Sequence, residues 1–452
     1  MEIKQWEDKN LAHFSYAILS EGEKKIILVD PARNPEQYLE YAKSKDAVIT
    51  GVIETHPHAD FVSSHAEIGK TTGAAIYTSK LVKADYPHKT FDDGDIIHIG
   101  KIKLSAINTP GHSPDGISIL LTHDGKQKAV FTGDTLFIGD CGRPDLREGA
   151  GHIKETRESL AKQMYYSLRE KLMTLDSDVL VYPAHGAGTL CGKSLSEAQS
   201  STIGAEKMTN WSLQEMSENE FVKNLLADQP FIPAYFPYDV ELNKTGAPAF
   251  RESISKVKIT DPIKSENETA HLQKDIWIID ARAENEFKKK HLPKSINLME
   301  GTKFETWLGS IIKPGEKFYL GGESIEQLKR LIERTASIGY EGYVKESFVI
   351  GYGSEKMNAL DLNGFKQNQE DYTIVDVRNS PEVKENEIFS GSIHIPLAEI
   401  RTRINEIPTT KPIVVHCAGG YRSAAASSLI QSKLNDQTKV FDLGEDIKSF
   451  SK

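Results

Sequence analysis

Histidines and carboxylates recur at short intervals in the N-terminal part of the chain, and their types and order suit a metal site. The segment ETHPHAD brings two imidazoles and a carboxylate onto one loop, and TPGHS, TGDT and YPAH follow it along the chain. The residues concerned are His56, His58, Asp60, His112, Asp134 and His185. Imidazoles and carboxylates are common ligands of transition metals. The ordered series predicts a metal centre, whereas isolated histidines such as His13 are expected to be surface or satisfied core residues.

A second reactive group is the thiol of Cys417, in the segment CAGGYRS that precedes a helical run. Backbone N–H groups at a helix start stabilise a thiolate or the terminal sulfur of a persulfide, so Cys417 is predicted to be a thiolate of low pKa. Gly419 and Gly420 permit tight curvature, and Arg422 adds positive charge. The same cradle could hold phosphate, so a phosphatase is a competing interpretation, and an inert buried cysteine is a third.

Apolar runs of strand type end at most of the metal-site residues. The clearest runs are residues 24–30, 47–55, 101–109, 128–134 and 177–185. Strands that deliver polar residues at their ends are a common way to build a site on loops. Residues 201–216 and 217–226 are predicted to be helical, and the proline-bearing stretch 231–248 is predicted to be irregular.

An internal repeat fills the C-terminal part of the chain. DIWIIDARAENEF and HLPKSINL resemble DYTIVDVRNSPEV and SGSIHIPL, and the separation from Arg282 to Gly321 equals that from Arg378 to Cys417. Two copies of one α/β unit are therefore expected. Up to this point, a repeated binding module without chemistry would show the same pattern.

Composition limits the classes of partner. The chain of 452 residues has 38% hydrophobic and 27% charged residues, a formal net charge of -10 and three cysteines. The length predicts several domains, the charge excludes nucleic acid and anionic membranes as expected partners, and no apolar run is long enough to span a bilayer. Few, scattered cysteines favour a reducing compartment, so the protein is expected to be cytoplasmic.

The histidine motifs resemble the metallo-β-lactamase superfamily over about residues 1–193. Its dinuclear members, such as glyoxalase II-type thioester hydrolases, read H-x-H-x-D-H, and this chain has Phe61 where the last histidine belongs. The resemblance thus implies one metal, held by His56, His112 and Asp134. Two imidazoles and one carboxylate with open positions suit Fe(II), one per chain, although ligand types alone leave zinc open. We expect His58, Asp60 and His185 to lie behind the ligands and to orient them.

The sequence GDCGRPDL after Asp134 resembles persulfide dioxygenases, and GAGTLCGKS with STIGAEKMTNW resembles the multidomain persulfide dioxygenase–rhodanese fusions. The resemblance implies that Arg143 holds an anionic thiol substrate. Because Cys191 follows His185 closely in the sequence, it is expected to line the iron pocket and to accept or position sulfane sulfur, the alternative being a packed thiol. Cys141 is equally compatible with a core position and a functional one.

The Cys417 loop, with DVR at Asp376–Arg378, resembles rhodanese sulfurtransferases, whose loop is one residue tighter than that of related phosphatases. The first copy keeps DAR at Asp280–Arg282 but has Gly321 at the cysteine position. It is therefore predicted to be catalytically dead, with a packing or interface role.

Together these patterns predict an αββα metallo-β-lactamase sandwich followed by two α/β rhodanese domains. The expected boundaries are 1–245 for the first domain with its helical extension, 246–262 for a linker, 263–350 for the degenerate rhodanese and 351–452 for the active one. The expected activity is oxidation of low-molecular-weight thiol persulfides with O2 to sulfite. Cys417 then forms thiosulfate or runs the reverse transfer, as part of sulfide detoxification in a homo-oligomer. A zinc thioester or phosphoester hydrolase and a persulfide-binding sensor remain the alternatives.

Overall fold

The computed structural model describes residues 1–147, 155–193, 195–434 and 438–450. The chain forms two compact units, Met1–Glu252 with Ser337–Gly339 and Ser253–Ala336 with Tyr340–Lys452. Within the described residues, no helix combines the length and apolar character that crossing a membrane requires.

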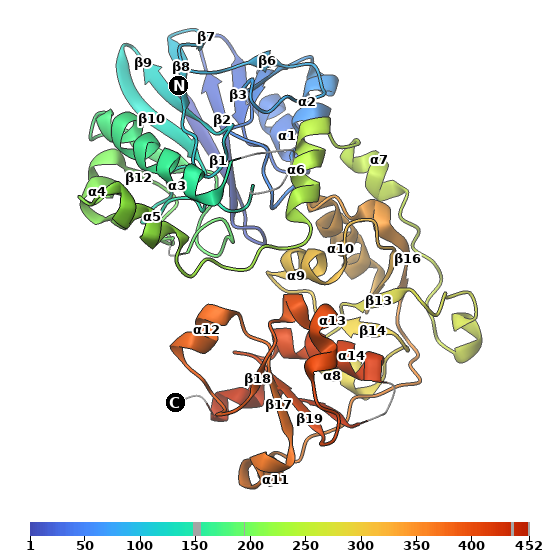
Figure 1. Ribbon diagram of the computed structural model, residues 1–452. Coiled ribbons are helices and arrows are strands. Elements are labelled where there is room, and N and C mark those ends of the chain that lie inside the picture. The colour runs from blue at the N-terminus through green and yellow to red at the C-terminus, as the bar shows by residue number, and fades with distance from the viewer. Residues whose placement is uncertain (148–154, 194, 435–437, 451–452) are drawn as a thin grey trace. The chain divides into compact units, whose positions relative to one another are not determined.

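Two six-stranded sheets form the first unit (Figure 1). The first has the order β1-β2-β3-β4-β5-β6. Its strands are β1 (Glu2–Asp8), β2 (His13–Ser20), β3 (Lys25–Val29), β4 (Val48–Ile53), β5 (Ala75–Thr78) and β6 (Lys89–Thr90). The second has the order β12-β11-β10-β9-β8-β7. Its strands are β7 (Ile96–Ile99), β8 (Ile102–Asn108), β9 (Ile117–His123), β10 (Lys126–Gly133), β11 (Leu180–Pro183) and β12 (Ser201–Thr202).

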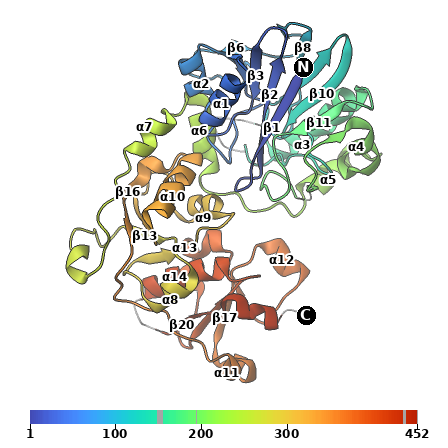
Figure 2. The same ribbon diagram turned by 180° about the vertical axis from the view of Figure 1, so that it is seen from behind.

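The two sheets face each other across an apolar core to which Phe14 and Ile27 of the first sheet and Leu104 and Phe131 of the second contribute. Helices cover the outer faces: α1 (Glu36–Ser44) and α2 (His65–Thr72) on the first sheet, and α3 (Arg157–Tyr166), α4 (Ile203–Thr209) and α5 (Glu218–Leu226) on the second. Figure 2 shows these helices from behind. This arrangement confirms the predicted αββα sandwich.

Short turns of 3-10 or π type interrupt the helical layer at Ser167–Lys171, Leu172–Thr174 and Trp211–Leu213. The unit continues through α6 (Phe236–Thr245). The next helix, α7 (Phe250–Ser255), contains the boundary between the two units, at Glu252 and Ser253. The prediction of an irregular stretch at residues 231–248 is therefore wrong for residues 236–245, which form α6. Pro237 lies in the first turn of α6, where a residue without an N–H group leaves no helical hydrogen bond unmade.

The second unit holds two four-stranded parallel sheets of the same topology, β14-β13-β15-β16 and β18-β17-β19-β20. The first copy comprises β13 (Trp277–Asp280), α8 (Glu284–Lys289), β14 (Ser295–Asn297), α9 (Phe304–Ile311), β15 (Phe318–Gly322), α10 (Ile325–Ser337) and β16 (Val344–Val349). The second comprises α11 (Leu362–Gln367), β17 (Thr373–Asp376), α12 (Ser380–Glu385), β18 (Ile393–His394), α13 (Ile400–Arg403), β19 (Ile413–His416), α14 (Tyr421–Leu434) and β20 (Val440–Asp442). The predicted repeat is thus a duplicated α/β unit.

Candidate metal centre and sulfur-carrying loop

Three predicted ligands converge at the ends of different strands. His56 follows β4, His112 follows β8 and Asp134 follows β10. All three are buried, and one potential ligand atom from each lies within 4.8 Å of the others. Oδ2 of Asp134 is 3.9 Å from Nε2 of His56 and 3.4 Å from Nε2 of His112.

Hydrogen bonds behind the two imidazoles decide which nitrogen faces the carboxylate. Nδ1 of His112 lies 2.8 Å from the carbonyl oxygen of Arg143. Because a carbonyl oxygen only accepts, Nδ1 carries the proton and Nε2 keeps its lone pair. The hydroxyl of Thr55 donates to Asp30 at 2.8 Å, so its oxygen accepts from Nδ1 of His56 at 3.0 Å. Both imidazoles therefore offer an Nε2 lone pair to the same small space.

The residues present fit one divalent metal ion. Among the described residues, Nε2 of His56 and Oδ2 of Asp134 have no hydrogen-bond partner although they are buried. Buried polar atoms are normally satisfied, and a bound cation would satisfy this set. Burial, with His58 as the next cause, holds the pKa of His56 well below its ordinary value, and burial also lowers the pKa of His112. Both are thus neutral, the form that binds a metal.

The three residues predicted to lie behind the ligands form a second buried group. His185 donates through Nδ1 to Oδ1 of Asp134 at 2.8 Å, and its Nε2 lies 2.9 Å from Oδ2 of Asp60. Burial alone would lower the pKa of His185, but the two carboxylates raise it well above its ordinary value. The His58 ring lies 4.1 Å from that of His56. The positions agree with an orienting role for these residues, which stays a prediction.

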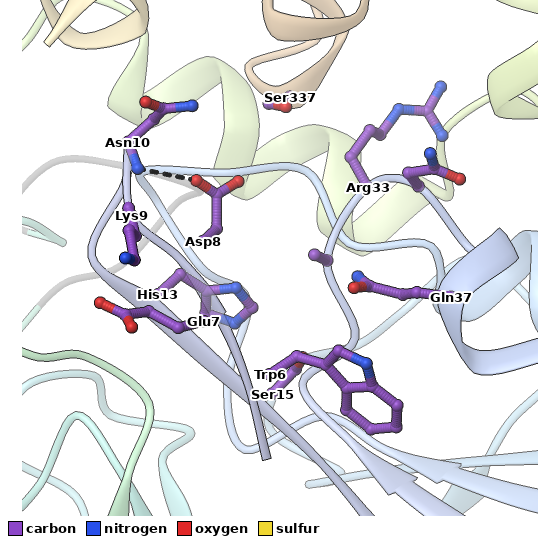
Figure 3. Close-up of a pocket in the computed structure, with 12 residues that line it drawn as sticks. Trp6, Glu7, Asp8, Lys9, Asn10, His13, Ser15, Arg33, Gln37 and Ser337 are labelled. Atoms are coloured by element: carbon purple, nitrogen blue, oxygen red, sulfur yellow. Dashed lines mark hydrogen bonds between the residues drawn. The ribbon is translucent and has the colours of Figure 1, made fainter. Parts of the chain in front are cut away.

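Phe61 and His13 pack beside this second group. Its ring centroid is 3.8 Å from that of His13 and 4.4 Å from that of His58. His13, on β2, is buried, and its Nε2 has no hydrogen-bond partner in the described part of the chain. His13 lines a pocket of about 300 Å³. Figure 3 shows its imidazole among the other lining residues, which include Glu7 and Asp8. His13 is therefore a core residue, as expected, but one of its ring nitrogens is unpartnered and is not satisfied as predicted.

Cys417 lies in a tight loop between β19 and α14. Its Sγ is buried and accepts a hydrogen bond from the backbone N–H of Gly420 at 3.1 Å. Gly420 has a φ of +101°, a conformation that favours glycine. Gly419 is exposed, and a Cβ there would meet nothing within 4 Å, so the loop is open to solvent at this position.

Arg422 holds a positive charge beside this loop. It donates to both carboxylate oxygens of Glu382, at 2.5 and 2.8 Å. Burial alone would lower the pKa of Arg422, but Glu382 and Cys417 raise it. The guanidinium is thus held in place by an acidic partner on α12, near Cys417.

Comparisons with known proteins agree with this arrangement. Residues 10–185 match the metallo-beta-lactamase superfamily, and residues 264–356 and 361–452 each match the rhodanese-like domain. The chain joins a metallo-β-lactamase superfamily domain to two rhodanese-like domains. The predicted fold class and family resemblance are confirmed.

A crystal structure of a metallo-beta-lactamase from Staphylococcus aureus subsp. aureus COL superimposes with a TM-score of 0.67 at 28% identity, covering 77% of this chain and 98% of that one. The mitochondrial persulfide dioxygenase of Homo sapiens is 29% identical over 174 residues, which are 38% of this chain and 63% of that protein, less than two thirds of its length. A cytoplasmic hydroxyacylglutathione hydrolase of Arabidopsis thaliana is 27% identical over 271 residues, 59% of this chain and 95% of that protein.

Helix α6 pins the ligand loop of the metallo-β-lactamase domain. The Asn243 amide donates to the carbonyl oxygens of His58 and Phe61, at 2.8 and 2.7 Å. Its Oδ1 accepts from the N–H of Ser63 at 2.8 Å. The segment predicted to be irregular thus holds the ETHPHAD loop in place. The only sequence signal for this role would have been a helix start at Pro237.

The GDCGRPDL loop is fixed by Asp140, a residue that the sequence reasoning missed. Its carboxylate accepts from the indole N–H of Trp211 at 2.7 Å and from the N–H of Lys193 at 2.8 Å. The amide of Asn210 donates to its carbonyl oxygen at 3.0 Å. Hydrogen bonds therefore link the three segments that carry the resemblance to the fusions, GDCGRPDL, GAGTLCGK and STIGAEKMTNW.

The three other residues singled out near the metal differ in their surroundings. Cys191 is buried, and its sulfur lies within 4.8 Å of ligand atoms of Asp134 and His185. Burial, then Asp60 and Asp134, raise its pKa well above the ordinary value, so it is a thiol. Cys141 packs in the apolar layer between the second sheet and its helices. The guanidinium of Arg143 is 1% exposed and donates to both carboxylate oxygens of Asp145, at 2.7 and 2.6 Å. That pairing gives no support to the predicted substrate contact of Arg143.

The degenerate rhodanese domain has filled its own loop. A Cβ at Gly321 would meet Cδ1 of Ile350 at 2.3 Å. The N–H of Glu323 donates to Oε1 of Gln327 at 2.8 Å, so a side chain of this copy occupies the acceptor position on the loop. A cysteine Cβ at position 321 would thus crowd Ile350, and one N–H group of the loop is already bonded within this copy.

Proposed function

We propose that the metallo-β-lactamase domain is a mononuclear Fe(II) persulfide dioxygenase. The observation that carries the proposal is the convergence of two Nε2 lone pairs and one carboxylate oxygen, from His56, His112 and Asp134, on one point. Ferrous iron bound there would supply oxygen activation and a Lewis-acid site for sulfur. The overall reaction is RSSH + O2 + H2O giving RSH, sulfite and two protons. The similarity to persulfide dioxygenases supports it.

The surrounding residues would hold the ligands in one protonation state. His185 uses its Nδ1 proton on Asp134, which leaves Oδ2 of that carboxylate for the metal. Thr55 and the Arg143 carbonyl fix the imidazole tautomers as described above. Cys191 lies beside Asp134 and His185, where its sulfur could receive sulfane sulfur from the substrate.

We further propose that the second rhodanese domain is a sulfur carrier. Cys417 would take sulfane sulfur from a second persulfide and transfer it to sulfite: Cys417–S–SH and sulfite give Cys417–SH and thiosulfate. The Gly420 N–H, 3.1 Å from the sulfur, and the nearby Arg422 would stabilise the anionic terminal sulfur. The reverse transfer uses the same groups. Linked domains raise the effective concentration of sulfite at the carrier. Cytoplasmic location and homo-oligomer formation stay predictions of the sequence.

The test is metal content together with oxygen uptake in the presence of glutathione persulfide and cysteine persulfide. One iron per chain and oxygen consumption with sulfite as the product would support the proposal. Two zinc ions per chain, with thioester hydrolysis restored by zinc and no oxygen uptake, would overturn it.

A zinc hydrolase is the second candidate, favoured by the buried group His58, Asp60 and His185 beside the first site and by the hydroxyacylglutathione hydrolase relative. Phe61 argues against a zinc hydrolase, because it occupies the position of the last histidine in the H-x-H-x-D-H motif, next to His58.

A further inference from the structure

The two rhodanese domains pack against each other within one unit: α14, which starts at the Cys417 loop, lies against β14 of the degenerate copy (Figure 1). The N–H of Asn297 on β14 donates to the hydroxyl of Ser428 at 2.9 Å. The degenerate copy therefore touches the helix that carries the sulfur cradle at its N-terminus.

One contact reaches the loop itself through Tyr421, the residue next to Gly420. The Tyr421 hydroxyl donates to the carbonyl oxygen of Met299 at 2.8 Å. Gly301 lies close to the ring, since a Cβ there would approach Cε2 of Tyr421 to 2.9 Å. Met299 and Gly301 both belong to the degenerate copy, so that copy fixes where α14 begins.

A second contact reaches the other side of the loop. Nζ of Lys288, on α8 of the degenerate copy, lies 2.9 Å from Oδ2 of Asp442, whose side chain is fully buried. The N–H of Gly444 donates to Oδ1 of the same carboxylate at 2.9 Å. A Cβ at Gly420 would lie 3.2 Å from the carbonyl carbon of Gly444, so the two backbones are in close contact. Lys288 thus supports Gly420 through Asp442 and Gly444.

The first contact ends at Tyr421, next to Gly420, and the second ends at Gly444, whose backbone touches Gly420. The N–H of Gly420 is the donor to the Cys417 sulfur. We propose that the degenerate rhodanese copy is the scaffold that positions this donor, with Gly301 and Lys288 as positioning residues for sulfur transfer at Cys417. The inference rests on the proposed sulfur-carrier function. A small displacement of a positioned group lowers a reaction rate by a large factor. Loosening either contact should therefore slow sulfur transfer by a larger factor than the loss in the free energy of unfolding would explain.

The test uses thiosulfate as sulfur donor to the whole chain in a single turnover. Cys417 forms a bond to the outer sulfur of thiosulfate, that sulfur's bond to the SO3 group breaks, and sulfite leaves. Loading is measured by the mass gain of the protein and by the thiocyanate released with cyanide. Urea unfolding of each variant gives its stability. The variants are Gly301→Ala, which pushes on the tyrosine ring, Tyr421→Phe, which removes only the hydroxyl, and Lys288→Met, which removes only the charge.

The matched control is Glu316→Gln. Glu316 of the degenerate copy pairs with Arg401 of the active one at 2.7 Å, so it belongs to the same interface through contacts to a different part of the active copy. We expect Gly301→Ala and Lys288→Met to slow loading by about tenfold or more, and Tyr421→Phe by a smaller factor. Glu316→Gln should stay within about twofold, and Lys288→Arg should restore the rate because it restores the charge.

Loading at the wild-type rate in Gly301→Ala and Lys288→Met would overturn the inference. The inference would also be overturned if the three test variants and Glu316→Gln all lost rate in proportion to their loss of stability. The interface would then only stabilise the fold. A wild-type chain that takes up no sulfur from thiosulfate or from persulfides would overturn the carrier function and this inference with it. Should Gly301→Ala fail to fold, Lys288→Met still decides, because the Lys288 side chain is partly exposed.

Discussion

Replacing Asn243 by alanine should loosen the ligand loop of the metal centre. The substitution removes two hydrogen bonds from the Asn243 amide, to the carbonyl oxygens of His58 and Phe61, and one from the N–H of Ser63. All the groups involved are buried, so no water replaces the lost partners without opening the loop. At roughly 1 kcal/mol for each bond, the expected loss is about 3 kcal/mol.

Hydrogen exchange, measured by mass spectrometry on peptides that cover residues 56–64, reports the free energy of opening of this loop. A loss of about 3 kcal/mol in the free energy of opening corresponds to exchange about a hundredfold faster, because each 1.4 kcal/mol is a factor of ten. The amide of Ser63 is a direct reporter, since Asn243 is its acceptor. Iron content should fall in parallel, because the open loop no longer holds His56 beside Asp134.

Thr245→Ala is the control, because Thr245 lies on the same helix, is exposed, and donates only to the carbonyl oxygen of Glu241 at 2.9 Å. Its effect should stay within about 0.5 kcal/mol, with unchanged exchange of the loop. If Asn243→Ala left both the exchange rates and the iron content at wild-type values, the reasoning that α6 secures the metal loop would be refuted.

Four further predictions concern single residues. His112→Ala should abolish iron binding and oxygen uptake while sulfur transfer at Cys417 continues, because the two sites lie in separate units; full oxygen uptake in this variant would contradict the ligand assignment. Cys417→Ser should keep oxygen uptake and shift the product from thiosulfate to sulfite, measured by ion chromatography, and thiosulfate formed at the wild-type rate would contradict the carrier role. Cys191→Ser should lower oxygen uptake with thiol persulfides at unchanged iron content, and full activity with every persulfide tried would make Cys191 a packed thiol only. Gly321→Cys should create no second sulfur carrier and should lower the free energy of unfolding by about 1–3 kcal/mol, because its Cβ would overlap Ile350; sulfur loading at this cysteine, seen in a Cys417→Ser background, would show that the loop is not blocked.

The location of the candidate metal site was predictable because its signals are local. Each ligand follows an apolar run, and the structure has strands at those runs: β4 before His56, β8 before His112 and β10 before Asp134. The Cys417 loop and the duplicated unit were visible for the same reason, since a strand, a glycine-bearing turn and a helix are contiguous in the chain. The αββα arrangement came from the resemblance that these motifs carry.

Other features depend on contacts between residues that are far apart in the sequence. Asn243 meets the ETHPHAD loop only after α6 folds against it, and prolines in that stretch suggested no helix. His13 is drawn to the metal region because its backbone pairs with that of His185, a partner that periodicity does not reveal. Arg143 is neutralised by Asp145, a pairing that the motif alone does not distinguish from a free guanidinium.

The sequence by itself thus determined which side chains could do chemistry and on which strand ends they lie, because strand propensity and turn residues act over short stretches of chain. Only the tertiary structure decided which histidine nitrogens keep a lone pair, which charges are already paired, and that the degenerate copy's Lys288 and Gly301 support the Cys417 loop. These properties follow from packing and hydrogen bonding across sheets and between the two copies, where partners are chosen by three-dimensional proximity and burial.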